Sequence, residues 1–197
     1  MTYLQLISRL ERGEPFSFSR FGDGEFNCMF GKKGANCDGH TYFPDLRERL
    51  CKAWDYPKGI IAVQRLGWEI YRDRLGENDL ADADILHRAS IKGELDLFLD
   101  QLKDVILVGP KHLRKMTIYR DFVEVNTRNA WLSYSDTLEE VNRLVQPGDV
   151  VLYCCGMMAE VLIHDMYAED ITQIDCGSVF DPYGGVNSRQ YHKNLKI

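Results

Sequence analysis

The sequence has no apolar run that approaches the roughly 18 residues of a membrane-spanning helix. Residues 1–15, MTYLQLISRLERGEP, lack the apolar core and cleavage site of a secretory signal. Repeats, low-complexity tracts and linker-like stretches are also missing. We therefore expect a single cytoplasmic domain over residues 1–197, in a reducing compartment where thiols stay free.

Basic residues are scarce relative to acidic ones. The chain has 24 Lys and Arg against 30 Asp and Glu, which gives a formal net charge of −6. This balance argues against a general affinity for nucleic-acid backbones, but it leaves room for a local basic groove. Hydrophobic residues make up 45% of the chain, which is enough for a substantial core.

The cysteines do not follow a clear zinc-binding pattern. Cys37 and His40 have a C-x2-H spacing, with Cys28 and Cys51 on either side. The other intervals do not match the usual spacings of zinc ligands. Buried or loop thiols are therefore favoured over a zinc site.

What the sequence does contain is an alternation of apolar strands and amphipathic helices. Residues 104–110, DVILVGP, form a near-continuous apolar run, which is typical of a parallel strand covered on both faces. The alternation predicts an α/β fold with a mostly parallel sheet flanked by helices. The expected strands are 15–21, 59–64, 104–110, 121–126, 149–156 and 171–181, and the expected helices are 2–13, 44–54, 67–75, 94–102, 135–149 and 157–168.

The segment SRFGDGEFN follows the first expected strand. Phe16, Phe18 and Arg20 share one face of that strand, because side chains alternate with a period of two. Arg20 would then lie at the end of the strand, where its guanidinium group can bind a phosphate. Gly22 and Gly24 allow a tight turn and a close approach of the backbone to a ligand.

Within this segment, Asp23 and Glu25 form a D-x-E pair. Two carboxylates at this spacing can coordinate one divalent cation, directly or through water, because hard cations favour carboxylate oxygens. Such a cation could bridge a diphosphate group. The alternative is a polar turn in which one of the two acids caps a helix.

Ligands in parallel α/β folds gather where the strands end, which draws attention to three further segments. Gly156 ends a strand and opens a helix whose free N–H groups can face an anion. No complete G-x-G-x-x-G accompanies it, so a dinucleotide site is poorly supported. Asp175, Ser178 and Asp181 surround the end of the last strand, and Gly109 ends another.

Three segments leave alternatives open. The basic cluster in residues 111–115 could hold phosphate, although a solvated face is favoured. Residues 126–131 could grip a base or sugar through an asparagine and Trp131, or form a loop around a buried aromatic ring. Residues 183–192, which include Arg189 and His192, form either a ligand lid, which is favoured, or a frayed terminus.

The stretches RFGDGEF, NAWLSYSD, CGMMAEVLIHDMY and IDCGSVFDPY occur together in an order and spacing that resemble the GT-D fold glycosyltransferases. That family has a D-x-E motif where other sugar transferases have D-x-D. The resemblance extends over nearly the whole chain. It implies a Rossmann-like single domain, a nucleotide-diphosphate sugar donor, typically a UDP-sugar such as UDP-glucose, and a divalent cation, Mn²⁺ or Mg²⁺.

Carried over to this sequence, the resemblance implies particular roles for single residues. Asp23 and Glu25 would belong to the metal and diphosphate site. Arg20 would stand beside them, Asn129 would line the donor pocket and Gly156 would begin the helix that faces the nucleotide. Asp175, Ser178 and Asp181 would complete the pocket. From the residues themselves, Gly22, Gly24 and Arg189 are also expected to bind the donor. The segment GSVFDPYGG departs from the family pattern, which often has a histidine and an aromatic-acidic run there.

A glycosyl transfer that inverts configuration needs a base to take the proton of the acceptor hydroxyl. Asp181 is the first candidate, followed by Asp175 and His192. The expected acceptor is a glycan or glycoprotein, and a modified DNA base is the less favoured choice. The alternatives to a transferase are a metal-dependent nucleotide phosphoesterase and a non-catalytic nucleotide-sugar binding protein.

Overall fold

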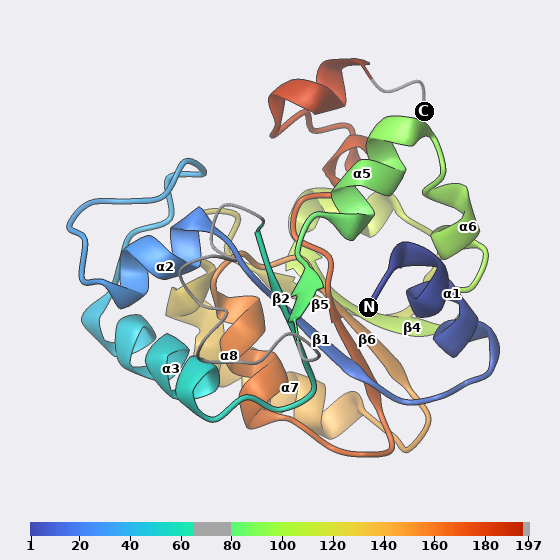
Figure 1. Cartoon of the computed structure of the whole chain (residues 1–197), viewed down its shortest axis with the longest axis horizontal. Helices are drawn as coiled ribbons and strands as arrows, with labels where there is room; N and C mark the ends of the chain where they lie inside the picture. Colours follow the sequence, from blue (N-terminus) through green and yellow to red (C-terminus); the bar gives the residue numbers. More distant parts are fainter. Residues whose placement is uncertain (65–79, 195–197) are drawn as a thin grey trace.

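The computed structural model describes residues 1–64 and 80–194, which contain a seven-stranded sheet (Figure 1). The strands lie in the order β3-β2-β1-β7-β6-β4-β5, and every neighbouring pair is parallel. The predicted α/β fold with a parallel sheet is thus confirmed. The strands are β1 (Ser17–Phe21), β2 (Ile60–Val63), β3 (Leu80–Asp82), β4 (Val105–Pro110), β5 (Tyr119–Val125), β6 (Val150–Tyr153) and β7 (Thr172–Asp175).

Helices cover both faces of the sheet, with α2, α3, α7 and α8 on one face and α1, α5 and α6 on the other (Figure 1). The α-helices are α1 (Tyr3–Glu11), α2 (Asp23–Met29), α3 (Pro44–Asp55), α5 (Ile85–Lys92), α6 (Asp96–Leu99), α7 (Tyr134–Leu144) and α8 (Met158–Asp165). Short 3-10 helices are η1 (Lys111–Lys115), η2 (Ala130–Ser133), η3 (Asp181–Gly184) and η4 (Gln190–Asn194).

The alternation of side chains along each strand divides the core into two layers. On β1, Phe18 packs into one apolar cluster together with Leu6 of α1 and Phe98 of α6. Phe21 packs into the other, where its ring lies 5.0 Å from that of Trp54 on α3. All six residues of β4 are buried, as expected for a strand covered on both faces.

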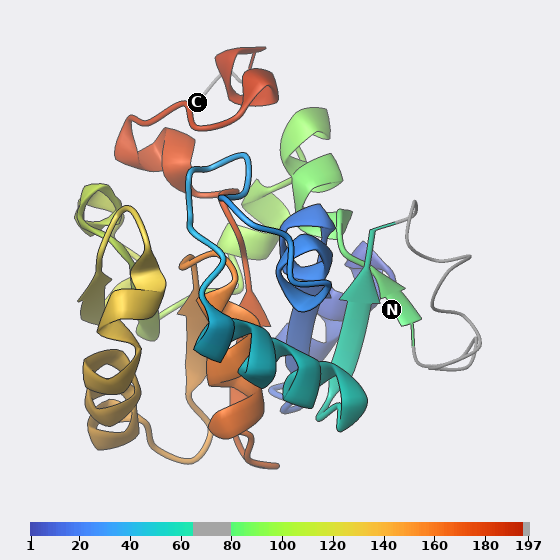
Figure 2. The same cartoon turned by 90° about the vertical axis from the view of Figure 1, so that its left-hand side faces the viewer.

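The connectivity places a switch point between β1 and β7. From β1 the chain continues outward to β2 and β3, and it then crosses to build β4 to β7 on the other side of β1. Ligands of parallel α/β folds bind beyond the carboxyl ends of the strands at such a point. The loop before α3 and the C-terminal segment, residues 185–194, come together at this end of the sheet (Figure 2).

Several predicted elements differ from those observed. The GDGE segment is the beginning of α2 rather than a tight turn, and β3 and α5 were not predicted. The last strand ends at Asp175, because Gly177 adopts a positive φ of 56° that turns the chain out of the sheet. The helix predicted over 67–75 lies outside the described residues. No helix among the described residues is long and apolar enough to span a bilayer.

Candidate functional site

A cluster of buried charges lies where β1 and β7 end. Arg20 is the last residue but one of β1, and its Nε donates to the carbonyl oxygen of Ala83 at 2.7 Å. Its Nη1 lies 3.7 Å from Oδ2 of Asp175 on β7. Glu25 and Glu160 also contribute to the field at Arg20. We call Arg20 and the three acids around it, Glu25, Glu160 and Asp175, the carboxylate cluster.

Burial raises the pKa of each acid in this cluster. It raises the pKa of Glu25 to about 7 and that of Glu160 well above its ordinary value, to which the charges of Asp175 and Glu25 add. The pKa of Asp175 is also raised by burial, against the opposing effect of Arg20. Oε2 of Glu160 has no hydrogen-bond partner among the described residues. Burial therefore disfavours ionisation of all three acids at once.

The sequence indicated Arg20 and Asp175 but not Glu160. Glu160 lies in the first turn of α8 with 2% of its surface exposed. It is the only acid in the run CGMMAEVLI, and a carboxyl group in such an apolar run was the available signal. Arg20 is held by protein partners on two sides, so its guanidinium group is built into the cluster rather than left free for a phosphate.

The D-x-E pair occupies the first turn of α2. Asp23 is exposed, and its backbone N–H donates to Oε1 of Gln64 at 3.2 Å. Glu25 is half-buried, and its Oε2 accepts the backbone N–H of Gly22 at 2.8 Å. Glu25 thus caps its own helix, which is the alternative that the sequence left open.

This geometry limits how a divalent cation could bind. Residues two apart on a helix project about 200° apart, so the carboxylates of Asp23 and Glu25 diverge. Among residues 1–64 and 80–194, no group of three or more His, Cys, Asp or Glu side chains is arranged to hold a metal ion. The pair fits a cation bound by one or two carboxylates that takes its other ligands from water and substrate phosphates, which is the usual situation of Mg²⁺.

A cleft of about 380 Å³ opens beside the carboxylate cluster, and we call it the strand-end cleft. Gly177 joins the two: it lines the cleft, and its N–H donates to Oδ1 of Asp175 at 2.8 Å. The lining comes from the ends of β4, β5, β6 and β7, from the loop before α3 and from the C-terminal segment. The lining residues are Cys37, Asp38, His40, Pro110, His112, Asn126, Thr127, Ala130, Cys154, Cys155, Gly156, Gly177, Ser178, Asp181, Val186, Ser188 and Arg189.

The structure brings four of the predicted binding and catalytic residues into this cleft, namely Gly156, Ser178, Asp181 and Arg189. Gly156 has a φ of 59°, and a Cβ added there would lie 3.6 Å from the His40 ring, which also lines the cleft. The other predicted residues lie outside the lining. These are Arg20, Gly22, Asp23, Gly24, Glu25, Asn129, Asp175 and His192.

Asp181 is held on both sides inside the cleft. Its Oδ1 lies 2.8 Å from Nε2 of His112 in η1, and its Oδ2 accepts the hydroxyl of Ser188. His112 belongs to the basic cluster for which a solvated face was favoured. Lys111, Arg114 and Lys115 are exposed as that interpretation requires, whereas the His112 side chain is only 16% exposed and lines the cleft.

The C-terminal segment is packed over the cleft. Arg189 donates to Ser178 Oγ at 3.1 Å and pairs with both carboxylate oxygens of Asp38 at 2.6 Å. Farther along, His192 is buried, and its Nδ1 accepts the Arg189 N–H at 3.2 Å. The Tyr191 ring packs against His87 of α5.

Residues 126–131 combine the two alternatives that the sequence left open, a ligand-binding loop and a loop around a buried aromatic ring. Asn126 and Thr127 line the cleft. Trp131 is buried instead, donates to Asp45 at 2.8 Å and stacks on Tyr134. Asn129 accepts the backbone N–H of Thr41 at 2.7 Å, so it holds the loop before α3 in place behind the cleft wall.

Comparisons with known proteins support the fold. No known family matches the sequence, and no curated protein does. The structure is similar to a DUF1792 glycosyltransferase from Streptococcus sanguinis, with a TM-score of 0.68 at 15% identity over 91% of this chain and 81% of that one.

Two further solved structures of the domain of unknown function 1792 agree. One is selenomethionine-substituted, and the other is described as having a distinct glycosyltransferase fold. Each has a TM-score of 0.67, at 16% and 17% identity, over 91% of this chain and 78% of the other. The chain therefore has this glycosyltransferase fold, as the GT-D resemblance predicts.

Proposed function

We propose that this protein is a glycosyltransferase that moves a sugar from a nucleotide-diphosphate sugar, a UDP-sugar, to an acceptor hydroxyl group. The observation that carries the proposal is the position of the strand-end cleft. It lies beside the switch point, at the carboxyl ends of β4 to β7, in a sheet whose fold matches the DUF1792 glycosyltransferases. The D-x-E helix and the carboxylate cluster lie at the same end of the sheet.

The chain offers distinct groups for each part of the donor. Arg189 lines the cleft with its guanidinium group held by Ser178 and Asp38, so it would place a fixed positive charge near the diphosphate. Ser178, Asn126 and the backbone at Gly156 offer hydrogen bonds to the nucleoside and sugar. Asp23 would hold the divalent cation together with the diphosphate, while Glu25 fixes the helix turn that carries Asp23. A bound cation would neutralise charge on the leaving diphosphate.

The carboxylate cluster supports this site from behind. Arg20 links β1 to Asp175 of β7, and Asp175 in turn holds the N–H of Gly177 in the cleft wall. Glu25 fixes the beginning of α2 through Gly22, which positions the exposed Asp23. These contacts order the groups that face the donor before it binds, which lowers the entropic cost of binding.

The proposed acceptor is a glycan or glycoprotein rather than a modified DNA base. Arg114, within the basic cluster of residues 111–115, is paired with Glu124 at 2.8 Å. Its charge is therefore partly neutralised, in a chain that already has a net charge of −6. Binding of duplex DNA that weakens steeply with salt in a gel-shift titration would contradict this choice of acceptor.

A thermal-shift screen of nucleotide sugars with MnCl₂, followed by release of the nucleoside diphosphate, tests the proposal. We expect UDP-glucose or another UDP-sugar to raise the melting temperature, because a ligand of the folded state stabilises it. Asp23→Ala should lower the rate of release about 100-fold. Asp96→Ala is the matched control, since Asp96 is also an exposed first-turn acid but lies on the opposite face of the sheet.

The outcomes separate the parts of the proposal. Full activity both in the presence of a chelator and in Asp23→Ala would show that the transfer reaction needs no divalent cation, and the proposed transfer itself would stand. Binding without release of any nucleoside diphosphate would indicate a nucleotide-sugar binding protein. Release of phosphate from a nucleotide without a sugar would indicate a phosphoesterase.

A further inference from the structure

The acid that the sequence favoured as catalytic base is not free to act as one. Both carboxylate oxygens of Asp181 are engaged, Oδ1 by His112 and Oδ2 by the hydroxyl of Ser188. The residue is also buried, with 8% of its surface exposed. A proton acceptor needs a lone pair that can reach the substrate, and Asp181 already uses one lone pair on each oxygen for a protein group while its side chain is buried.

The neutral ring of His112 has a nitrogen lone pair that binds no group of the described chain. Because a carboxylate only accepts, Nε2 of His112 carries the hydrogen toward Asp181, and the lone pair of the neutral ring is on Nδ1. The Cδ2 edge of the ring packs against Gly184, so tightly that a Cβ on that glycine would lie 2.6 Å from it. Nδ1 is on the opposite edge of the ring, and no residue of the described chain hydrogen-bonds to it.

We propose that His112 is the catalytic base of the transfer reaction and that Asp181 and Ser188 are positioning residues that fix its ring. The inference rests on the proposed glycosyltransferase function. As the acceptor oxygen bonds to the anomeric carbon, its proton passes to Nδ1 of His112. The bond from the anomeric carbon to the diphosphate oxygen breaks, and its electron pair leaves with the nucleoside diphosphate. The imidazolium then returns its proton to solvent.

The arrangement explains the contacts around η1 and η3. Asp181 orients the ring and stabilises the imidazolium that forms when the proton arrives. Ser188 occupies the second oxygen of Asp181, so the carboxylate cannot rotate away from the ring. Because Ser188 belongs to the C-terminal segment, closure of that segment over the cleft and alignment of the base are linked.

The test compares two nucleophiles in wild type, His112→Ala and His112→Gln. Water needs a base to remove its proton, whereas azide attacks as an anion and needs none. We measure diphosphate release from the nucleotide sugar selected by thermal shift, with MnCl₂, with and without sodium azide. Glycosyl azide is quantified by mass spectrometry. His112→Gln keeps an N–H near the position of Nε2 and so preserves the contact with Asp181.

We expect both variants to lose about 100-fold in water-driven release while azide-driven release stays within about threefold of wild type. Lys111→Ala, an exposed neighbour outside the cleft, should match wild type with both nucleophiles. Equal loss with water and azide would show that His112 only supports the structure, and wild-type rates in both variants would also overturn the proposal. If wild type itself cleaves no nucleotide sugar, the proposed function fails, and this inference fails with it.

Discussion

At the scale of single residues, Gly177 is the position on which the carboxylate cluster most directly depends. Its φ is 56°, and a Cβ there would overlap Nη1 of Arg20. Gly177→Ala should therefore displace Arg20 from Asp175 and destabilise the protein by more than the roughly 1–2 kcal/mol of backbone strain alone. Urea denaturation followed by circular dichroism measures the loss.

Gly148→Ala provides the matched control. Gly148 also has a positive φ, of 88°, but nothing lies within 4 Å of the position of an added Cβ. That variant should show the backbone strain without the clash. If the two alanine variants lose the same stability, the contact between Gly177 and Arg20 contributes nothing beyond the turn.

The site residues that could be predicted are those fixed by local geometry. The period of two placed Arg20 on the same face as Phe16 and Phe18, and both phenylalanines are buried on that side. The contact between Asp181 and His112 could not be predicted, because it joins residues 69 positions apart and requires the packing of η1 against η3. A sequence shows which acids are present but not which of their oxygens are already bound.

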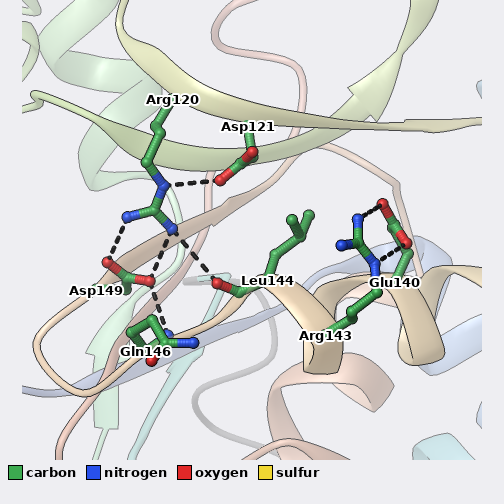
Figure 3. A network of polar contacts seen from close by, with 7 residues as sticks. All are labelled: Arg120, Asp121, Glu140, Arg143, Leu144, Gln146 and Asp149. Atoms are coloured by element: carbon green, nitrogen blue, oxygen red, sulfur yellow. Dashed lines mark hydrogen bonds and ion pairs between the residues drawn. The ribbon is translucent and has the colours of Figure 1, made fainter.

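At the scale of elements, Asp149 ties the beginning of β6 to β5 and to the chain after α7. Its two oxygens accept from Arg120 of β5 at 3.0 Å, and Oδ2 also accepts the Gln146 N–H at 2.8 Å (Figure 3). Asp149→Asn should lower the free energy of unfolding by about 1 kcal/mol at pH 7, a modest value because Arg120 is 40% exposed.

This effect should depend on pH in a definite direction. The hydrogen bonds from Arg120 lower the pKa of folded Asp149 below the roughly 3.9 of an unfolded aspartate. Its stabilisation is therefore complete above that value and is lost as the pH falls through the folded pKa. Urea titrations at pH 7 and pH 3 should show wild type and Asp149→Asn converging at the lower pH.

Glu140→Gln is the comparison for this prediction. Glu140 pairs with Arg143 on the exposed face of α7 and links no two elements (Figure 3). Glu140→Gln should lower the free energy of unfolding at pH 7 by less than Asp149→Asn does. If the difference in unfolding free energy between wild type and Asp149→Asn stayed constant across the pH range, the ion pair of Asp149 with Arg120 would not be the source of the effect.

Long apolar strands were predicted well, and short polar elements were not. The run DVILVGP is buried in full because both faces of the central sheet are covered, so its composition alone identified it. In α2, the glycines and acids indicate a turn, and the helix forms because Phe26 and Cys28 pack into the core. Tertiary packing overrides a weak local preference there, and local reasoning does not include it.

At the scale of the whole molecule, the strand order explains why the site residues are dispersed along the chain. The parallel sheet brings the ends of β1 and β7 together, although more than 150 positions separate Ser17 from Gln173 in the pairing of these strands. The predicted parallel sheet, which the structure confirms, places all the strand ends at one edge. Which strands are neighbours depends on the crossover after β3, which no local pattern specifies.

The C-terminal segment is the part of the molecule that closes over this edge, and Arg189 holds it there. Arg189→Ala removes the contacts with Ser178 and Asp38, which should make local opening of the segment easier by about 1 kcal/mol. Chymotrypsin should then cleave after Tyr191 roughly fivefold faster, since opening precedes cleavage. Intact-mass analysis of a time course identifies the cleaved bond.

Two further variants decide whether Arg189 acts through the contact with the loop before α3. Asp38→Ala removes the carboxylate partner of Arg189 and should also speed cleavage after Tyr191, though less, because the bond to Ser178 remains. Arg114→Ala breaks a pair with Glu124 outside the segment and should leave the rate unchanged. Equal rates in Arg189→Ala and Arg114→Ala would mean that other contacts, such as the ring contact of Tyr191 with His87, suffice to hold the segment.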